Sequence, residues 1–264
     1  MLKIRHIAKT FNPGTITEKK ALVDVDLHLL PGDFVTVIGG NGAGKSTTLN
    51  AVAGTFLVDK GTIEVDGVDV TRLPEYKRAK YLGRVFQDPM TGTAASMTIE
   101  ENLALAYRRG KLRTLRWGIT NKERETFRQA LSTLELGLED RMTSRVGLLS
   151  GGQRQALTLL MATLQKPKLL LLDEHTAALD PKTAQKVLHL TRKLIADDNL
   201  TAMMVTHNMK DALQYGNRTI MMHEGKIILD INRETKSHLK VDDLLRMFEK
   251  ASGSGIVNDR MLLG

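Results

Sequence analysis

One glycine-rich segment, residues 39–47, constrains this chain more than any other part of it. It follows the pattern of glycine, four residues and then Gly-Lys-Ser, which cradles phosphate groups. Small residues let the backbone turn tightly and aim several N–H groups inward. Lys45 then supplies a positive charge for the outer phosphates, and Ser46 offers a hydroxyl to the accompanying magnesium ion. The predicted phosphate contacts are Gly39, Gly40, Asn41, Gly42, Ala43, Gly44, Lys45, Ser46 and Thr47.

The flanking residues support this interpretation. Residues 34–38 form a short apolar run that is typical of a buried strand, and residues 47–53 can continue as a helix. A loop between a strand and a helix is the context in which this motif binds phosphate. The motif does not select a function, because phosphate loops occur in kinases, GTPases, recombinases and transport motors.

The composition excludes several classes of protein. With 264 residues, 42% of them hydrophobic, the chain can form one large domain or two modest ones with a true core. It has no cysteine, which rules out a disulfide framework and a thiolate metal site. No apolar run approaches the roughly 20 residues that span a bilayer, and residues 1–6 do not resemble a signal peptide. We therefore expect a soluble, cytoplasmic protein.

The net charge of +8 is concentrated in one place, the basic segment 108–124, which has seven basic residues and one acid. Such a local patch, with Trp117 inside it, favours phospholipid head groups or an acidic partner over a nucleic-acid channel. A solvated basic loop is the alternative. The basic residues are Arg108, Arg109, Lys111, Arg113, Arg116, Lys122 and Arg124.

Two later segments carry further candidate site residues. Residues 169–174 read Leu-Leu-Leu-Leu-Asp-Glu, a buried strand that ends on two acids where ligands bind in open α/β sheets. Asp173 suits a metal shell, and Glu174 can orient or deprotonate an attacking water; an acid pair that caps a nearby helix is the alternative. His207 ends another strand, 202–206. A lone histidine is usually structural, but its place at a strand end beside the proposed phosphate site makes contact with the γ-phosphate the functional alternative.

Two features stay open at this point. Ser150, Gly151, Gly152 and Gln153 begin a buried helix, and they fit an anion site and a simple N-cap equally well. Phe11 ends a strand, where it can pack in the core or stack on a base; its position favours core packing.

The rest of the chain shows two further regions. Residues 2–11 and 21–30 alternate as in an antiparallel β region, and residues 90–148 resemble a helical insertion.

Six motifs together resemble the ATPase subunits of ABC transporters. In order they are the phosphate loop, Gln87, Leu-Ser-Gly-Gly-Gln at 149–153, Leu-Leu-Leu-Leu-Asp-Glu, Ala-Leu-Asp at 178–180, and His207. The pentapeptide is highly specific to that family, and the resemblance covers nearly the whole chain. The run 173–181 is similar to one bacterial branch of importer-like ATPases, although His175 stands where the family often has proline. That histidine either caps the turn or tunes Glu174.

The resemblance implies an α/β fold with a P-loop NTPase core, an antiparallel β subdomain and a helical subdomain. The core would comprise 34–89 and 149–231, the β subdomain 1–35 and 61–70, and the helical subdomain 90–148. We expect a single domain at 1–250 and a short tail at 251–264.

The resemblance also implies how the site works. Two copies would close head to tail, each ATP lying between the phosphate loop of one copy and residues 150–153 of the other. Lys45, Glu174 and His207 would be catalytic, while Ser46, Gln87 and Asp173 would hold Mg²⁺. Asp180 would communicate across the dimer, and Phe11 would stack on adenine.

The implied partners are a second copy of the chain and a separate integral membrane permease, with a substrate-binding protein if the system is an importer. The permease would hold the chain on the inner face of the cell membrane, with 90–148 as its docking region. Small-solute uptake is expected, with amino acids as one candidate, and nucleic acid is not. The alternative is a soluble ABC-type ATPase in iron–sulfur assembly or DNA repair.

Overall fold

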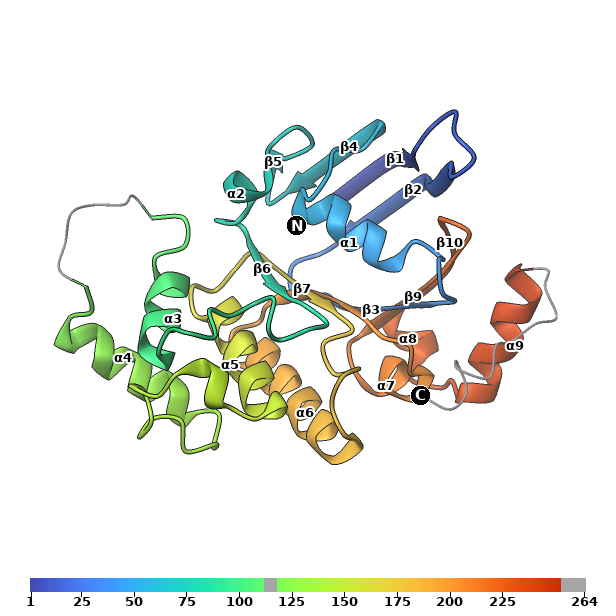
Figure 1. Cartoon of the computed structure of the whole chain (residues 1–264). Helices are drawn as coiled ribbons and strands as arrows, with labels where there is room; N and C mark the ends of the chain where they lie inside the picture. The colour runs from blue at the N-terminus through green and yellow to red at the C-terminus, as the bar shows by residue number, and fades with distance from the viewer. Residues whose placement is uncertain (112–117, 253–264) are drawn as a thin grey trace.

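The computed structural model describes residues 1–111 and 118–252, and it contains two sheets and the helices that cover them (Figure 1). The larger sheet has the strand order β10-β9-β3-β8-β7-β6. Strands β6 to β9 and β3 run parallel, and β10 is antiparallel to β9. The strands are β3 (Phe34–Gly39), β6 (Leu82–Val85), β7 (Leu169–Asp173), β8 (Thr201–Val205), β9 (Arg218–His223) and β10 (Lys226–Ile231).

The smaller sheet is antiparallel, in the order β2-β1-β4-β5. Its apolar residues share one buried cluster with helix α1 (Lys45–Ala53) and with Val35 and Val37 of β3. The loop that precedes α1 is therefore held between two sheets. The strands are β1 (Leu2–Phe11), β2 (Lys19–Leu29), β4 (Lys60–Val65) and β5 (Val68–Asp69).

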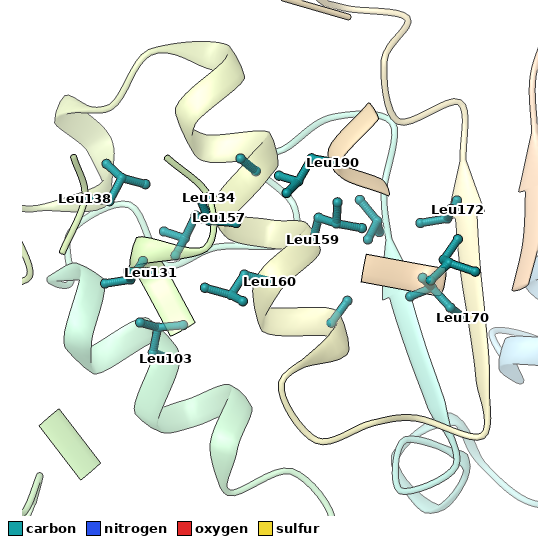
Figure 2. Packing of buried hydrophobic residues seen from close by; sticks show 14 of the residues in the cluster. Leu103, Leu131, Leu134, Leu138, Leu157, Leu159, Leu160, Leu170, Leu172 and Leu190 are labelled. Atoms are coloured by element: carbon teal, nitrogen blue, oxygen red, sulfur yellow. The ribbon is translucent and has the colours of Figure 1, made fainter. Parts of the chain in front are cut away.

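A second buried cluster joins the helices to the larger sheet. Figure 2 shows leucines of α5, such as Leu157, lying between those of α3 and α4, such as Leu103, and those of β7, such as Leu170. Capping boxes begin α3 at Thr98 and α4 at Thr120. These helices are α3 (Ile99–Tyr107), α4 (Asn121–Ser132), α5 (Gly151–Thr163) and α6 (Pro181–Asp197).

The remaining helices are α2 (Glu75–Arg78), a 3-10 turn at Val146–Leu148, α7 (Met209–Gln214), α8 (Arg233–Lys236) and α9 (Val241–Ser252). Across residues 1–111 and 118–252, no helix has the length and apolar character to cross a bilayer. Arg113, Arg116 and Trp117 of the basic segment and most of the expected tail lie outside the described residues. The mixed α/β architecture, with one largely parallel and one antiparallel sheet, confirms the predicted fold class.

Candidate functional site

The phosphate loop connects the last residue of β3, Gly39, to the first residue of α1, Lys45. Gly39 has φ 147°, and a Cβ atom there would lie 2.2 Å from the carbonyl oxygen of Met222. Gly44 has φ 102°, and its Cβ would lie 2.9 Å from the oxygen of Ala21. Both positions therefore require glycine, because β9 and β2 approach the loop backbone too closely for a side chain.

Lys45 is almost wholly buried at the foot of this loop, with 5% of its surface exposed. Its Nζ donates hydrogen bonds to the carbonyl oxygens of Gly39 at 2.8 Å and Gly40 at 3.1 Å. Burial lowers the pKa of Lys45, while the nearby carboxylates of Glu174 and Asp173 oppose that change. The ammonium group thus lies against the loop, within electrostatic reach of the two acids at the end of β7.

Ser46 and Asp173 meet although 127 positions separate them in the sequence. The Ser46 Oγ donates to Oδ1 of Asp173 at 2.9 Å. Burial raises the pKa of Asp173, and the hydrogen bond from Ser46 opposes this. A hydroxyl and a carboxylate side by side form the oxygen donor set that Mg²⁺ prefers, so these two residues fit the ion.

Gln87 is not joined to that pair. It is exposed in the turn after β6, and no hydrogen bond between described residues links it to Ser46 or Asp173. The predicted role of Gln87 as a third magnesium ligand therefore stays a prediction.

Glu174 and His207 are brought together by the register of two neighbouring strands. Asp173 of β7 pairs with Val205 of β8, and the Glu174 N–H donates to the Val205 oxygen at 3.1 Å. The Nε2 atom of His207 then lies 2.6 Å from Oε2 of Glu174. The Glu174 side chain is only 11% exposed, and its backbone has φ 45°. A residue other than glycine in this left-handed conformation is uncommon, which indicates a constrained carboxylate.

His175 points away from this pair and into the protein. It is 2% exposed, and its Nε2 lies 3.0 Å from Oγ1 of Thr191 on α6. The Thr191 hydroxyl donates to the oxygen of Val187 at 2.8 Å, so the imidazole N–H is the donor in the first contact. Burial lowers the pKa of His175 to about 4. The ring is a neutral anchor between the Glu174 turn and α6, and among the described residues no hydrogen bond joins it to the Glu174 side chain.

Residues 150–153 form a capped helix start. The Gln153 N–H donates to Ser150 Oγ at 3.3 Å, and Gln153 Oε1 accepts from the Ser150 N–H at 3.2 Å. A Cβ on Gly152 would lie 2.3 Å from Cγ2 of Thr183, the residue whose N–H donates to Asp180 at 3.1 Å. The segment therefore lies beside the Asp180 turn. Among described residues, no hydrogen bond joins it to the phosphate loop of the same chain.

Phe11 is half-buried and belongs to none of the buried core clusters of the described chain. Its ring meets that of Phe56 edge to face at 5.1 Å, and Lys9 Nζ lies 5.6 Å from its centroid. The core-packing interpretation drawn from its position is wrong, because the end of β1 extends past the core. Stacking on adenine stays a prediction.

Sequence reasoning missed one cation near the loop. The Nζ of Lys19, on β2, would lie 3.5 Å from a Cβ placed on Gly42. It comes from the antiparallel sheet, where an exposed lysine carries no local pattern that could have identified it.

Comparisons with known proteins agree with this geometry. Residues 22–177 match the family described as ABC transporter. The chain is 45% identical to a tyrosine transport ATP-binding protein of Clostridioides difficile, over 95% of this chain and 100% of that protein. It is 33% identical to a methionine import ATP-binding protein of Enterococcus faecalis, over 86% and 64% of the two chains.

A solved ATP-binding cassette, a dimer in a post-hydrolysis state bound to ADP and phosphate, superposes with a TM-score of 0.75 at 30% identity. That match covers 88% of this chain and 99% of the cassette. The resemblance carried by the six ordered motifs is thereby confirmed, and the chain belongs to the ABC transporter family, whose ATP-binding subunits hydrolyse ATP to power transport.

Proposed function

We propose that two copies of this chain hydrolyse ATP as a head-to-tail homodimer, and that a separate membrane permease uses the cycle to take up a small solute. One observation carries the proposal. One edge of the larger sheet gathers the predicted hydrolytic residues, which are Lys45, Ser46, Asp173, Glu174 and His207. Residues 150–153, in contrast, have no hydrogen bond to the phosphate loop within the described chain. The second half of the site is then supplied by a second copy.

Each residue at the sheet edge has a distinct task. Ser46 and Asp173 would hold Mg²⁺, which would supply positive charge to offset that of the phosphates. Lys45 adds a fixed positive charge against the outer phosphates. Glu174 accepts a proton from the water that attacks the γ-phosphorus, and His207 orients the Glu174 carboxylate through the 2.6 Å contact.

The homodimer is tested by the dependence of ATP hydrolysis on protein concentration. If residues 150–153 act on the ATP of the other copy, the rate per molecule rises through the concentration range in which dimers form. A rate per molecule that is constant through that range contradicts the composite site. A dimeric cassette with ADP and phosphate among the similar structures supports this arrangement.

Transport of amino acids is the favoured function because two relatives are named for tyrosine transport and methionine import. The permease, with a substrate-binding protein if the system imports, would hold the chain at the inner face of the membrane. Purification of the tagged chain from membranes tests this directly. An integral membrane protein should copurify, and uptake of radiolabelled tyrosine by cells should fall when Glu174 is changed to Gln. A chain that copurifies with no membrane protein contradicts the proposal and favours a soluble role.

A further inference from the structure

A basic cavity lies away from the phosphate loop, between helices α7 and α8 and the start of α9. In Figure 1 these elements gather beside the edge of the larger sheet that carries β9 and β10. The cavity has a volume of about 660 Å³, which falls in the range of small-molecule sites. None of its lining residues belongs to the nucleotide site described above.

Four basic side chains line this cavity and no acid does: Lys210, Arg233, Lys236 and Lys240. None of the four has an ion-pair partner among the described residues, whereas Arg218 nearby pairs with Asp230. Two acids on the same helices are engaged by other groups: Asp243 accepts from the backbone N–H of Lys240, and Asp211 is buried on α7. The lining of the cavity therefore carries positive charge that no ion pair among the described residues neutralises.

Lys236 marks the cavity as more than a group of surface lysines, because it is only 6% exposed. Its Nζ donates to the oxygen of Tyr215 at 2.5 Å and to Oγ1 of Thr36 at 3.5 Å. An ammonium group has three N–H donors, so these contacts leave one. Burial lowers the pKa of Lys236 to about 8. A charged amine in such a place is stabilised by a nearby anion.

The number and type of the cations indicate the ligand. We propose that this cavity binds a di- or triphosphate group, either as a free anion or as part of a nucleotide. A single carboxylate would neutralise one of the four charges, whereas a di- or triphosphate group carries several. The Arg233 guanidinium can form paired hydrogen bonds to phosphate oxygens, and the lysines act as point charges. Leu213, Leu239 and Val241 add non-polar surface for the remainder of a nucleotide.

The location links this cavity to the hydrolytic site. Asn208 caps α7 directly after His207, and Lys210 and Gln214 of the same short helix line the cavity. A ligand that contacts both α7 and α8 would therefore fix the helix that follows His207. The assignment of the cavity does not depend on the homodimer or on transport.

The test uses full-length protein that carries Lys45→Ala, so that phosphate binding at the loop is weakened. Calorimetric titration with pyrophosphate and, separately, with ADP then measures the binding that does not depend on the phosphate loop. We expect at least one of the two to bind one site per chain, and the added pair Arg233→Ala and Lys240→Ala to weaken that binding at least tenfold. Both residues are exposed, so the fold should be kept, which a thermal melt verifies.

The matched control is Lys250→Ala in the same Lys45→Ala background. Lys250 is an exposed lysine of α9 that does not line the cavity, and its removal should change the affinity less than twofold. Binding of pyrophosphate alone would assign a free anion, and tighter binding of ADP would assign a nucleotide. Binding of neither, or equal binding by the Arg233→Ala/Lys240→Ala protein, would overturn the assignment.

Discussion

The imidazole Nε2 of His207 lies 2.6 Å from Oε2 of Glu174. This contact follows from strand register, since Asp173 and Val205 are paired across β7 and β8 and each site residue comes shortly after its strand. The register of the sheet therefore places the two side chains beside each other. The contact with His207 orients the Glu174 carboxylate in the absence of substrate. Substitution of each residue can separate their functions.

Glu174→Gln should abolish most hydrolysis while nucleotide binding is retained. The amide has nearly the same shape but cannot accept the proton of the attacking water, so the rate should fall by about 10²–10⁴-fold. Phosphate release and light scattering with ATP measure the loss of turnover and the trapped dimer. Glu135→Gln, at an exposed glutamate, should leave both unchanged. Normal turnover in Glu174→Gln would remove Glu174 from the role of base.

His207→Ala should slow hydrolysis, and its effect should depend on Glu174. If the histidine acts by orienting that carboxylate, the double variant Glu174→Gln/His207→Ala is about as slow as Glu174→Gln alone, because residues that act as a unit are not additive. Single-turnover rates of the four proteins give the coupling. Losses that multiply in the double variant would instead assign His207 an independent contact with the phosphate.

Much of the site could be predicted because its residues lie at ends of recognisable elements. Ser46 and Asp173 each belong to a local pattern, a phosphate loop and a leucine strand that ends on acids, and parallel strands bring such ends to one edge. Lys19 has no such pattern, and its proximity to the loop depends on how the antiparallel sheet lies over α1. The hydrogen bond from His175 to Thr191 joins two buried residues of separate elements. The hydrophobic periodicity of a sequence predicts that such residues are buried, but it does not predict which of them contact each other.

Phe11 and Ser150 show two other limits. An aromatic residue at a strand end looks the same in sequence whether the core reaches it or not, so the position of Phe11 favoured the wrong environment. Ser150 and Gln153 satisfy a capping box within one chain. A capping box does not prevent the same residues from contacting an ATP bound to another chain. Neither the sequence nor one copy of the fold can therefore separate the role of helix cap from that of phosphate contact.

Ser46→Ala should raise the magnesium concentration needed for hydrolysis, and Ser46→Thr should not. Alanine removes the hydroxyl that lies 2.9 Å from Asp173, while threonine keeps it. We expect the half-saturating Mg²⁺ concentration to rise about tenfold in the alanine variant. A tenfold change corresponds to about 1.4 kcal/mol of binding free energy, which is what one hydrogen bond or ligand typically contributes. Chelation of the metal should stop hydrolysis in all three proteins. Equal magnesium dependence for Ala and Thr would exclude the Ser46 hydroxyl as a ligand.

Thr191→Val should weaken the anchor that holds the Glu174 turn on α6. Valine keeps the shape but cannot accept the His175 N–H, so a buried donor loses its partner at a cost of about 1–3 kcal/mol. Thr191→Ser keeps the hydroxyl and serves as the matched control. The free energy of unfolding, measured with urea, and kcat should both fall in the valine variant and stay near wild type in the serine variant. Identical behaviour of Val and Ser would show that the contact does not position the turn.

Lys236→Met should remove a rise in stability at alkaline pH. Burial holds the pKa of Lys236 at about 8, below its ordinary value of 10.5, so between these values the unfolded chain binds the proton and the folded chain does not. The free energy of unfolding therefore increases with pH across that window, and the cost of the buried charge is fully present below pH 8. At about 1.4 kcal/mol for each pH unit, the gain is at most about 3 kcal/mol. The free energy of unfolding, measured with urea at pH 7.5 and at pH 10, should rise by up to this amount more in wild type than in Lys236→Met. The exposed Lys250→Met serves as the control and should behave like wild type. A difference between wild type and Lys236→Met that does not change with pH would mean that Lys236 stays charged throughout.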